Sequence, residues 1–264
     1  MPELPDVEGF RRTLDACGRG RRIEKVHVTD RGVLRGVSER GLRGALEGRT
    51  LRAPQRHGKW LIARTDGGPA LLLHFGMTGR LLCCPPRDPP QRYDRVRLDL
   101  GGGRGLRYQD QRKLQGLRLA ADEAEVERAL RGQGPDALSV GREEFGGLLR
   151  RRRATLKAVL MDQSALAGLG NLLVDEILWR ARLSPARPAN TLTDEQARAL
   201  YAAMRRTLRL AVPTGRVPGR RSWLTGRRDD GDPRCPRCGT GLRRRRIAGR
   251  TTVDCPHCQP EQGR

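Results

Sequence analysis

Residues 235–258 read CPRCGTGLRRRRIAGRTTVDCPHC and carry the strongest structural signal in the chain. Cys235 pairs with Cys238, and Cys255 with Cys258, across sixteen intervening residues. This spacing is typical of tetrahedral zinc sites, because each pair forms a tight knuckle and the segment between them is long enough for a β-hairpin. Four thiolates leave no open coordination position. We therefore predict one structural Zn²⁺ in a C-terminal four-cysteine zinc finger.

The other three cysteines, Cys17, Cys83 and Cys84, lack ligand spacing, and we expect them to be small, largely buried packing side chains. The N-terminus lacks the pattern of a secretory leader, and no stretch approaches the ~18 consecutive apolar residues of a membrane span. We expect a cytoplasmic protein with no membrane partner. In that reducing compartment cysteines favour metal binding over disulfides.

The charge balance indicates a polyanionic partner. Lys and Arg total 53 against 30 Asp and Glu, which gives a formal charge of +23. Such an excess on a chain with ordinary core periodicity is typical of proteins that bind a phosphate backbone. Aromatic residues make up only 3% of the chain, which leaves few stacking platforms for single strands. An RNA-binding zinc-ribbon protein is thus a weaker alternative to a binder of double-stranded DNA, and preference for duplex over single strand separates the two.

Hydrophobic periodicity divides the chain into two halves. Residues 6–16 have the spacing of a short helix, and residues 23–28, 59–64, 70–75 and 96–100 alternate as strands do. A glycine run at 101–103 then predicts a hairpin. We predict a β-sandwich with a flanking helix over residues 1–130.

The second half reads as helical after a Gly/Pro-rich linker that we place at 131–150. Residues 151–212 contain helical segments at 156–162 and 172–181, joined by a tight turn at 166–171, and a capping box begins at Thr193. We predict an α-helical DNA-binding domain there. A loop and the zinc finger follow over 213–264. The fold class is α+β with several domains, and we expect a monomer.

The N-terminus offers a second candidate site. Removal of Met1, which is normal before proline, exposes Pro2 as a secondary amine. An α-amino group has a pKa of ~8, so part of it is neutral and nucleophilic at neutral pH, and attack on a carbonyl-like carbon gives an iminium. Glu3 beside it suits general acid or base catalysis. Taken alone this signal is weak, because prolines often follow an initiator methionine.

Several short motifs follow one another along the chain. They are Met1-Pro-Glu-Leu-Pro-Asp-Val-Glu8, His57-Gly-Lys59-Trp, His74-Phe-Gly-Met77-Thr-Gly, Leu156-Lys157-Ala-Val-Leu-Met-Asp162-Gln, Gly168-Leu-Gly-Asn171-Leu-Leu-Val-Asp-Glu176-Ile, and Gly249-Arg250-Thr-Thr before the last cysteine pair. Jointly they make the chain resemble the formamidopyrimidine-DNA glycosylase/endonuclease VIII family. The resemblance implies a catalytic β-sandwich, residues 1–130, joined to a helix–two-turn–helix domain with a zinc finger. It also implies a cytoplasmic protein of bacterial type that is associated with the nucleoid.

The resemblance also implies a function. A family member clamps duplex DNA that contains oxidised bases or abasic sites, flips out the damaged nucleotide, excises the base and nicks the strand. By the same resemblance Pro2 is the nucleophile and Glu3 the acid/base. The other implied roles are a phosphate clamp made of Lys59, Lys157, Asn171 and Arg250, and an insertion into the base stack made of Met77, Arg112 and Leu114.

From the residues alone, more ordinary roles stay open for some of these positions. Asn171 suits a helix N-cap, Lys59 a strand-edge charge and Lys157 a solvated helix residue. Asp162 and Glu176 suit structural roles in orienting the helices. His257 lies between two cysteines and is expected to be a bystander.

Three departures from the family pattern bear on substrate preference. Asp6 stands where the family usually has glutamate, and Leu114 replaces an aromatic residue. The segment 212–234 is short and arginine-rich where formamidopyrimidine-type members carry a longer loop. We expect a bifunctional DNA glycosylase/AP lyase. Its alternatives are an endonuclease VIII-like preference for oxidised pyrimidines and a non-catalytic protein that binds damaged DNA.

Overall fold

The structure is a computed structural model that describes residues 1–261. The chain divides into two compact units, one of Met1–Pro2 with Asp6–Gly132 and one of Glu3–Pro5 with Gln133–Arg264. The expected combination of a β-sandwich, a helical domain and a C-terminal cysteine cluster is confirmed. Within residues 1–261 no helix combines the length and the apolar character needed to cross a membrane.

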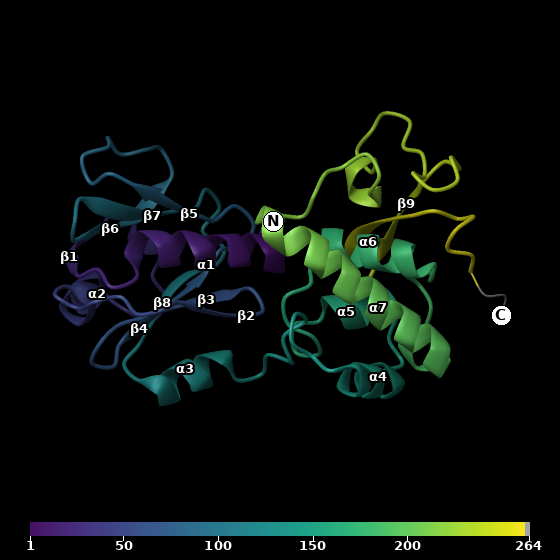
Figure 1. Ribbon diagram of the computed structural model, residues 1–264, viewed down its shortest axis with the longest axis horizontal. Helices are drawn as coiled ribbons and strands as arrows, with labels where there is room; N and C mark the ends of the chain where they lie inside the picture. The colour runs from purple at the N-terminus through teal and green to yellow at the C-terminus, as the bar shows by residue number, and fades with distance from the viewer. Residues whose placement is uncertain (262–264) are drawn as a thin grey trace. The chain divides into compact units, whose positions relative to one another are not determined.

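The first unit contains two antiparallel sheets of four strands each (Figure 1). One sheet has the order β1-β6-β7-β5 and the other β2-β3-β4-β8. The strands are β1 (Ile23–Val28), β2 (Gln55–His57), β3 (Trp60–Arg64), β4 (Ala70–His74), β5 (Arg80–Cys84), β6 (Asp94–Leu100), β7 (Arg104–Gln109) and β8 (Gly116–Ala120).

Burial along the strands explains why these sheets stack. In β6 buried and half-buried residues alternate, so one face of this strand lies in the core. In β4 the residues Ala70, Leu71, Leu72 and Leu73 are all buried. Leu71 and Leu73 join the core between the sheets, whereas Ala70 and Leu72 pack against helix α3 (Glu123–Leu130) on the outer face. Strand β4 is therefore apolar at consecutive positions because both of its faces are covered, one by the core and the other by α3.

Two further helices complete the first unit. Helix α1 (Leu4–Gly18) confirms the predicted N-terminal helix and starts slightly earlier, because proline is tolerated in a first helical turn. Its Val7 and Leu14 are buried in the same core as the two sheets. Helix α2 (Glu39–Leu46) has Ser38 as its N-cap, and the hydroxyl of Ser38 accepts the N–H of Gly41.

The structure corrects two sequence predictions in this unit. Cys17 and Cys83, expected to be separate packing side chains, form a disulfide between α1 and β5. Tertiary folding brings together two thiols that lie 66 residues apart, a proximity that their spacing does not indicate. Lys59, expected within a strand, lies in the turn between β2 and β3. Cys84 is half-buried, and its Sγ accepts the Nε–H of Arg107 at 3.0 Å.

The second unit is helical up to the C-terminal four-cysteine finger, residues 235–258. Its helices are α4 (Arg142–Arg150), α5 (Leu156–Met161), α6 (Asn171–Ala181) and α7 (Asp194–Ala211). It also contains the short 3-10 turns η2 (Ala189–Thr191), η3 (Val212–Thr214) and η4 (Leu224–Gly226), whereas the turn η1 (Arg31–Val33) belongs to the first unit. Helix α7 packs against both α4 and α6 (Figure 1). The predicted capping box at Thr193 is confirmed. The segment expected to be a linker contains α4, because its buried Phe145, Leu148 and Leu149 complete the helical core.

The C-terminal hairpin consists of β9 (Arg243–Ile247) and β10 (Arg250–Asp254), which pair antiparallel between the two cysteine knuckles. Trp179 of α6, Leu224 and Val253 form a small buried cluster with Cys235, Cys255 and Cys258. The finger is thus part of the second unit.

Candidate functional site

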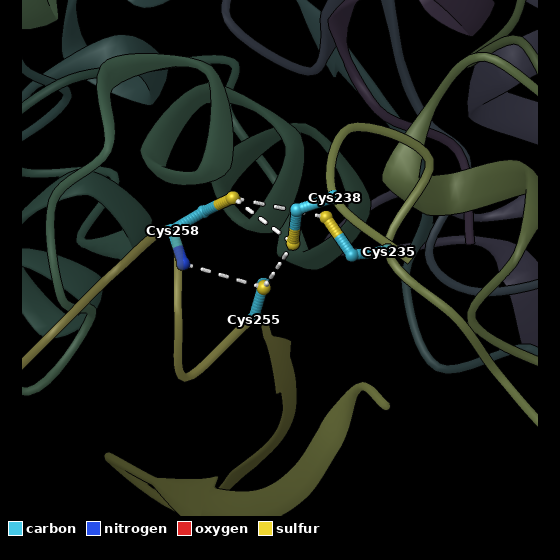
Figure 2. Close-up of side chains that lie close together, drawn as sticks. All are labelled: Cys235, Cys238, Cys255 and Cys258. Atoms are coloured by element: carbon cyan, nitrogen blue, oxygen red, sulfur yellow. Dashed lines mark hydrogen bonds between the residues drawn. The ribbon is translucent and has the colours of Figure 1, made fainter. Parts of the chain in front are cut away.

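The four C-terminal cysteines come together as their spacing predicts (Figure 2). All four Sγ atoms lie within 4.8 Å of one another. The Sγ–Sγ separations are 3.5 Å for Cys238 and Cys258, 3.6 Å for Cys238 and Cys255, and 3.9 Å for Cys235 and Cys258. With Zn–S bonds of about 2.3 Å, a tetrahedron places its sulfurs roughly 3.8 Å apart. The donor set therefore fits a structural Zn²⁺.

Ionising all four thiols of this cluster is unfavourable without a cation. Burial raises the pKa of Cys255 to about 12 and also raises the pKa of Cys258. Hydrogen bonds from the hydroxyl and the backbone N–H of Thr240 lower the pKa of the exposed Cys238 to about 6. Two of the buried thiols thus resist ionisation. A divalent cation offsets this cost by ligating the thiolates directly.

The hairpin of the finger presents Arg250 at its tip. Ile247 and Arg250 are paired residues at the ends of β9 and β10, and the turn between them is Ala248-Gly249. Both turn residues have positive φ, 49° and 72°, as a two-residue hairpin turn with the twist of its strands requires. Arg250 follows directly and is exposed, so its guanidinium is available to an external anion.

The arginine run at 243–246 divides according to strand alternation. Arg243 and Arg245 donate to the buried carboxylate of Asp254, at 2.7 and 3.0 Å. Arg244 and Arg246 are exposed. Half of this run is therefore structural, and the other half adds positive charge to the surface of the finger.

Glu3 is held at the start of α6. Its carboxylate accepts three backbone N–H groups, from Gly170 at 3.1 Å, Leu172 at 2.8 Å and Leu173 at 3.0 Å. Free N–H groups at a helix N-terminus favour an anion, both by hydrogen bonding and through the helix dipole. Glu3 is 1% exposed. The fold therefore fixes this carboxylate in one orientation and stabilises its ionised form.

The glycines of the turn at 166–171 are explained by this arrangement. A Cβ on Gly170 would lie 2.3 Å from the carboxylate carbon of Glu3. Gly168 has a φ of +111°, and a Cβ there would lie 2.7 Å from Leu4. Glycine at these two positions lets the turn approach residues 3 and 4 closely.

Asn171 differs from its expected role as the helix cap. Gly170 occupies the N-cap position and Asn171 is the first residue of α6. Because the carboxylate of Glu3 satisfies the helix amides, the Asn171 side chain is released to donate to the carbonyl of Thr251 in β10, at 2.9 Å. Its Oδ1 atom is buried and has no hydrogen-bond partner within residues 1–261. Asn171 thus joins α6 to the strand that carries Arg250.

Lys157 is also placed differently from the sequence prediction. Its ammonium forms a buried ion pair with Asp175, and both side chains are 0% exposed. The second oxygen of Asp175 accepts Arg228 Nη1 at 3.1 Å and the backbone N–H of Val253 at 3.2 Å. Burial lowers the pKa of Lys157 and raises the pKa of Asp175, while each charge opposes the shift of the other.

This network joins four segments of the second unit: α5, α6, the loop before the finger and β10. The ammonium is fully buried, and the place of Lys157 in the phosphate clamp stays a prediction. Asp175, on a neighbouring helix, draws the lysine inward, which corrects the interpretation of Lys157 as a solvated helix residue. Instead, Lys157 and Arg228 neutralise the carboxylate that fixes β10 beside α6.

In the first unit, Met77, Arg112 and Leu114 lie on two loops, one between β4 and β5 and one between β7 and β8. Met77 is 40% exposed and Leu114 50% exposed, so both apolar side chains are accessible from solvent. The guanidinium of Arg112 lies 3.0 Å from the sulfur of Met77. The structure therefore brings the loops of these three predicted residues together.

Buried polar contacts hold the two loops in register. Asp110 Oδ1 accepts the hydroxyl of Thr78 at 2.5 Å and the N–H of Arg112 at 3.1 Å. Lys113, with a φ of +51°, donates to Asp30 at 2.9 Å. These contacts compensate for the strained backbone between Arg112 and Leu114.

The remaining predicted residues of this unit are Pro2 and Lys59, which are both half-buried. Pro2 precedes the first turn of α1. Burial lowers the pKa of His74 to about 4, and repulsion from the nearby ammonium of Lys59 is the second cause of this shift. His74 is therefore neutral at physiological pH, and it does not add a second positive charge beside Lys59.

Several residues that shape the site escaped sequence reasoning. Asp175 could have been identified from the sequence, because the acidic pair Asp175-Glu176 interrupts the apolar run Leu172–Trp179. Carboxylates in such a run predict buried partners of opposite charge. The other member, Glu176, is buried and binds Arg180 and the N–H of Thr225, in keeping with its predicted structural role. Arg228 gave no signal, because it is one of many arginines in an irregular segment.

Comparisons with known proteins agree with this geometry. Residues 1–117 match the formamidopyrimidine-DNA glycosylase N-terminal domain, and residues 132–220 match the formamidopyrimidine-DNA glycosylase H2TH domain. The formamidopyrimidine-DNA glycosylase of a Nocardioides species is 37% identical, across 98% of this chain and 95% of the relative. That of Salinispora arenicola is 36% identical, across 100% of this chain and 98% of the relative.

Solved structures show the same likeness. The Lactococcus lactis protein in complex with DNA containing Fapy-dG, crystallised as the G226P mutant, has a TM-score of 0.90 and 27% identity over 98% of this chain and all of that chain. The complex of the Lactococcus lactis protein with DNA containing an abasic site has a TM-score of 0.88 and 28% identity, again over 98% of this chain and all of that chain.

The buried network generates a stability prediction. Asp175→Asn keeps the size of the side chain but leaves Lys157 and Arg228 without a buried counter-charge. We expect the second unit to lose about 3–5 kcal/mol of unfolding free energy, the usual cost of breaking a buried pair from one side. Urea unfolding followed by the fluorescence of Trp179 and Trp223, which both belong to this unit, measures the loss.

The matched control is Asp229→Asn. Asp229 also lies beside Arg228, at 3.9 Å, but its side chain is 74% exposed. We expect a change within about 0.5 kcal/mol, because exposed pairs contribute little. Equal effects at the two positions would show that burial of Asp175 is not what gives this network its importance.

Proposed function

The chain belongs to the formamidopyrimidine-DNA glycosylase family, and from this premise we propose that it is a bifunctional enzyme of duplex DNA repair. It excises oxidised bases and then cleaves the strand as an AP lyase. The observation that carries the proposal is the placement of Glu3: an ionised carboxylate, fixed by the first amides of α6, directly follows the residue that becomes the N-terminal amine.

Chemistry begins with Pro2 once Met1 is removed. Its neutral secondary amine attacks C1′ of the damaged nucleotide, the bond from C1′ to the base breaks, and the base leaves with a proton supplied by water. The ionised Glu3 takes up the proton that the attacking amine releases and passes it to the sugar ring oxygen as the ring opens, which leaves a cationic iminium between Pro2 and C1′. A secondary amine has no second proton to lose, so this iminium stays positively charged and withdraws electrons.

Strand cleavage follows from that electron withdrawal. Loss of a proton from C2′ expels the 3′ phosphate by β-elimination, and a further proton loss expels the 5′ phosphate by δ-elimination. Water then hydrolyses the iminium to regenerate the amine. Glu3 is the group positioned to shuttle these protons, since its carboxylate is held rigidly and its charge is stabilised by the helix.

DNA binding is divided between the two units. Lys59 in the first, with Asn171 and Arg250 in the second, contact phosphates around the lesion, and Lys157 supports the latter two through Asp175. Met77, Arg112 and Leu114 enter the base stack to replace the flipped nucleotide. The formal charge of +23 supports such a clamp and gives binding a steep dependence on salt.

The proposal predicts a covalent adduct. Protein whose mature N-terminus is Pro2, verified by mass spectrometry, becomes trapped on an abasic duplex when borohydride reduces the iminium. Protein that retains a residue before Pro2 does not, because its proline nitrogen is an amide. Absence of an adduct and of lyase activity in the mature protein, with DNA binding that Pro2→Gly leaves unchanged, would favour a non-catalytic binder of damaged DNA.

A lesion panel identifies the substrate. In single-turnover reactions on otherwise identical duplexes, we expect faster excision of oxidised purines, including formamidopyrimidines, than of oxidised pyrimidines. The family assignment favours this order, whereas the short arginine-rich segment at 212–234 and the missing aromatic at Leu114 favour the reverse. Faster excision of oxidised pyrimidines would establish the endonuclease VIII-like alternative.

The exposed Leu114 allows a direct test of insertion into the stack. Leu114→Phe supplies a ring that stacks on the neighbouring base, and we expect tighter binding to an abasic duplex by about 1 kcal/mol, roughly fivefold. Leu210→Phe is the control, since Leu210 is 40% exposed on α7 and has no assigned DNA contact. Comparable gains from both variants would refute a specific place for residue 114 in the stack.

A further inference from the structure

Trp179 connects the central helix of the second unit to the cysteine cluster. It lies in α6, eight positions after Asn171, and is 5% exposed. Its indole N–H donates to the Sγ atom of Cys235 at 3.4 Å. We propose that Trp179 belongs to the outer shell of the zinc site and sets the affinity of the finger for zinc.

The chemistry of the indole supports this role. The N–H is the only polar group of the side chain, and a buried donor requires an acceptor. A zinc-bound thiolate is a strong acceptor, because four thiolates around one Zn²⁺ leave two net negative charges in a partly buried site. A hydrogen bond from the indole lowers the charge density on Cys235 and orients its sulfur. Such outer-shell contacts typically change metal affinity by roughly 10- to 100-fold.

The first knuckle holds Trp179 by two further contacts. Arg237, inside the Cys235–Cys238 knuckle, places its guanidinium 4.3 Å from the centre of the indole ring. The same guanidinium donates to the backbone carbonyl of Trp179 at 3.1 Å. Trp179 therefore contacts the knuckle through its indole N–H, the π face of its ring and its backbone carbonyl. Together these contacts fix the direction of the indole donor.

The second knuckle docks onto the same end of α6 through Gln259. Its side-chain oxygen accepts the N–H of Cys255 at 3.0 Å, and its amide donates to the carbonyl of Leu183 at 2.9 Å. Gln259 is 1% exposed. Both knuckles are thus bonded to residues of α6 or to the turn that ends it, so metal release requires these contacts to loosen. The link is reciprocal: an intact α6 favours bound zinc, and bound zinc favours the arrangement of α6.

The experiment replaces the N–H without changing the shape of the ring. β-(3-Benzothienyl)alanine, which has sulfur in place of the indole nitrogen, is incorporated at position 179 of the full-length protein, and Trp179→Phe is prepared alongside it. Zinc affinity is measured by competition with a chromogenic chelator. We expect both replacements to weaken zinc binding by about 10- to 100-fold. The control is Trp60→Phe, a buried tryptophan of the first unit, for which we expect wild-type affinity.

Two outcomes would overturn the proposal. One is wild-type zinc affinity in the benzothienyl protein. The other is an equal loss in Trp60→Phe, which would indicate a general effect of tryptophan removal. A second measurement uses the variant Trp60→Phe/Trp223→Phe, where Trp179 is the remaining tryptophan. Chelation should shift its emission, and an unchanged spectrum would contradict the contact with Cys235. Neither assay contains DNA, so both are independent of the proposed lyase chemistry.

Discussion

The arrangement of the second unit depends on the buried carboxylate of Asp175. It accepts hydrogen bonds from Lys157, Arg228 and the backbone N–H of Val253, and so joins two helices, the loop before the finger and strand β10. A buried ion network is costly to desolvate and is tolerated only when its geometry is well satisfied. That requirement specifies one relation between α6 and β10, and with it the positions of Asn171 and Arg250.

Helix α6 serves different purposes along its length. Its first amides bind the carboxylate of Glu3, its first side chain contacts β10, its middle carries Asp175 and Glu176, and its last full turn carries Trp179 against Cys235. In the proposed function, an acid/base residue, a phosphate contact and the contact to a metal site therefore all depend on one rigid element. Positions on a helix are held more precisely than positions on loops, which suits chemistry that needs exact placement of a carboxylate.

Prediction from the sequence worked where the signal is local. Cysteine spacing identified the metal donors, because ligand geometry restricts the distance along the chain between knuckle residues. The glycines at 168 and 170 marked a tight turn before α6. Prediction failed where a distant partner decides the outcome. Lys157 turns inward because Asp175 lies opposite, Asn171 is released from capping because Glu3 takes that role, and Cys17 meets Cys83 across 66 residues.

The sequence by itself therefore determined the family, the four cysteines that cluster, the candidate nucleophile and the α+β organisation, since each rests on residue type and short-range spacing. Only the tertiary structure decided which charges are buried, which amide groups hold Glu3, and how the finger is attached to α6. The physical reason is that burial and hydrogen-bond partners are properties of pairs that are distant in sequence. No single segment encodes them before the chain has folded.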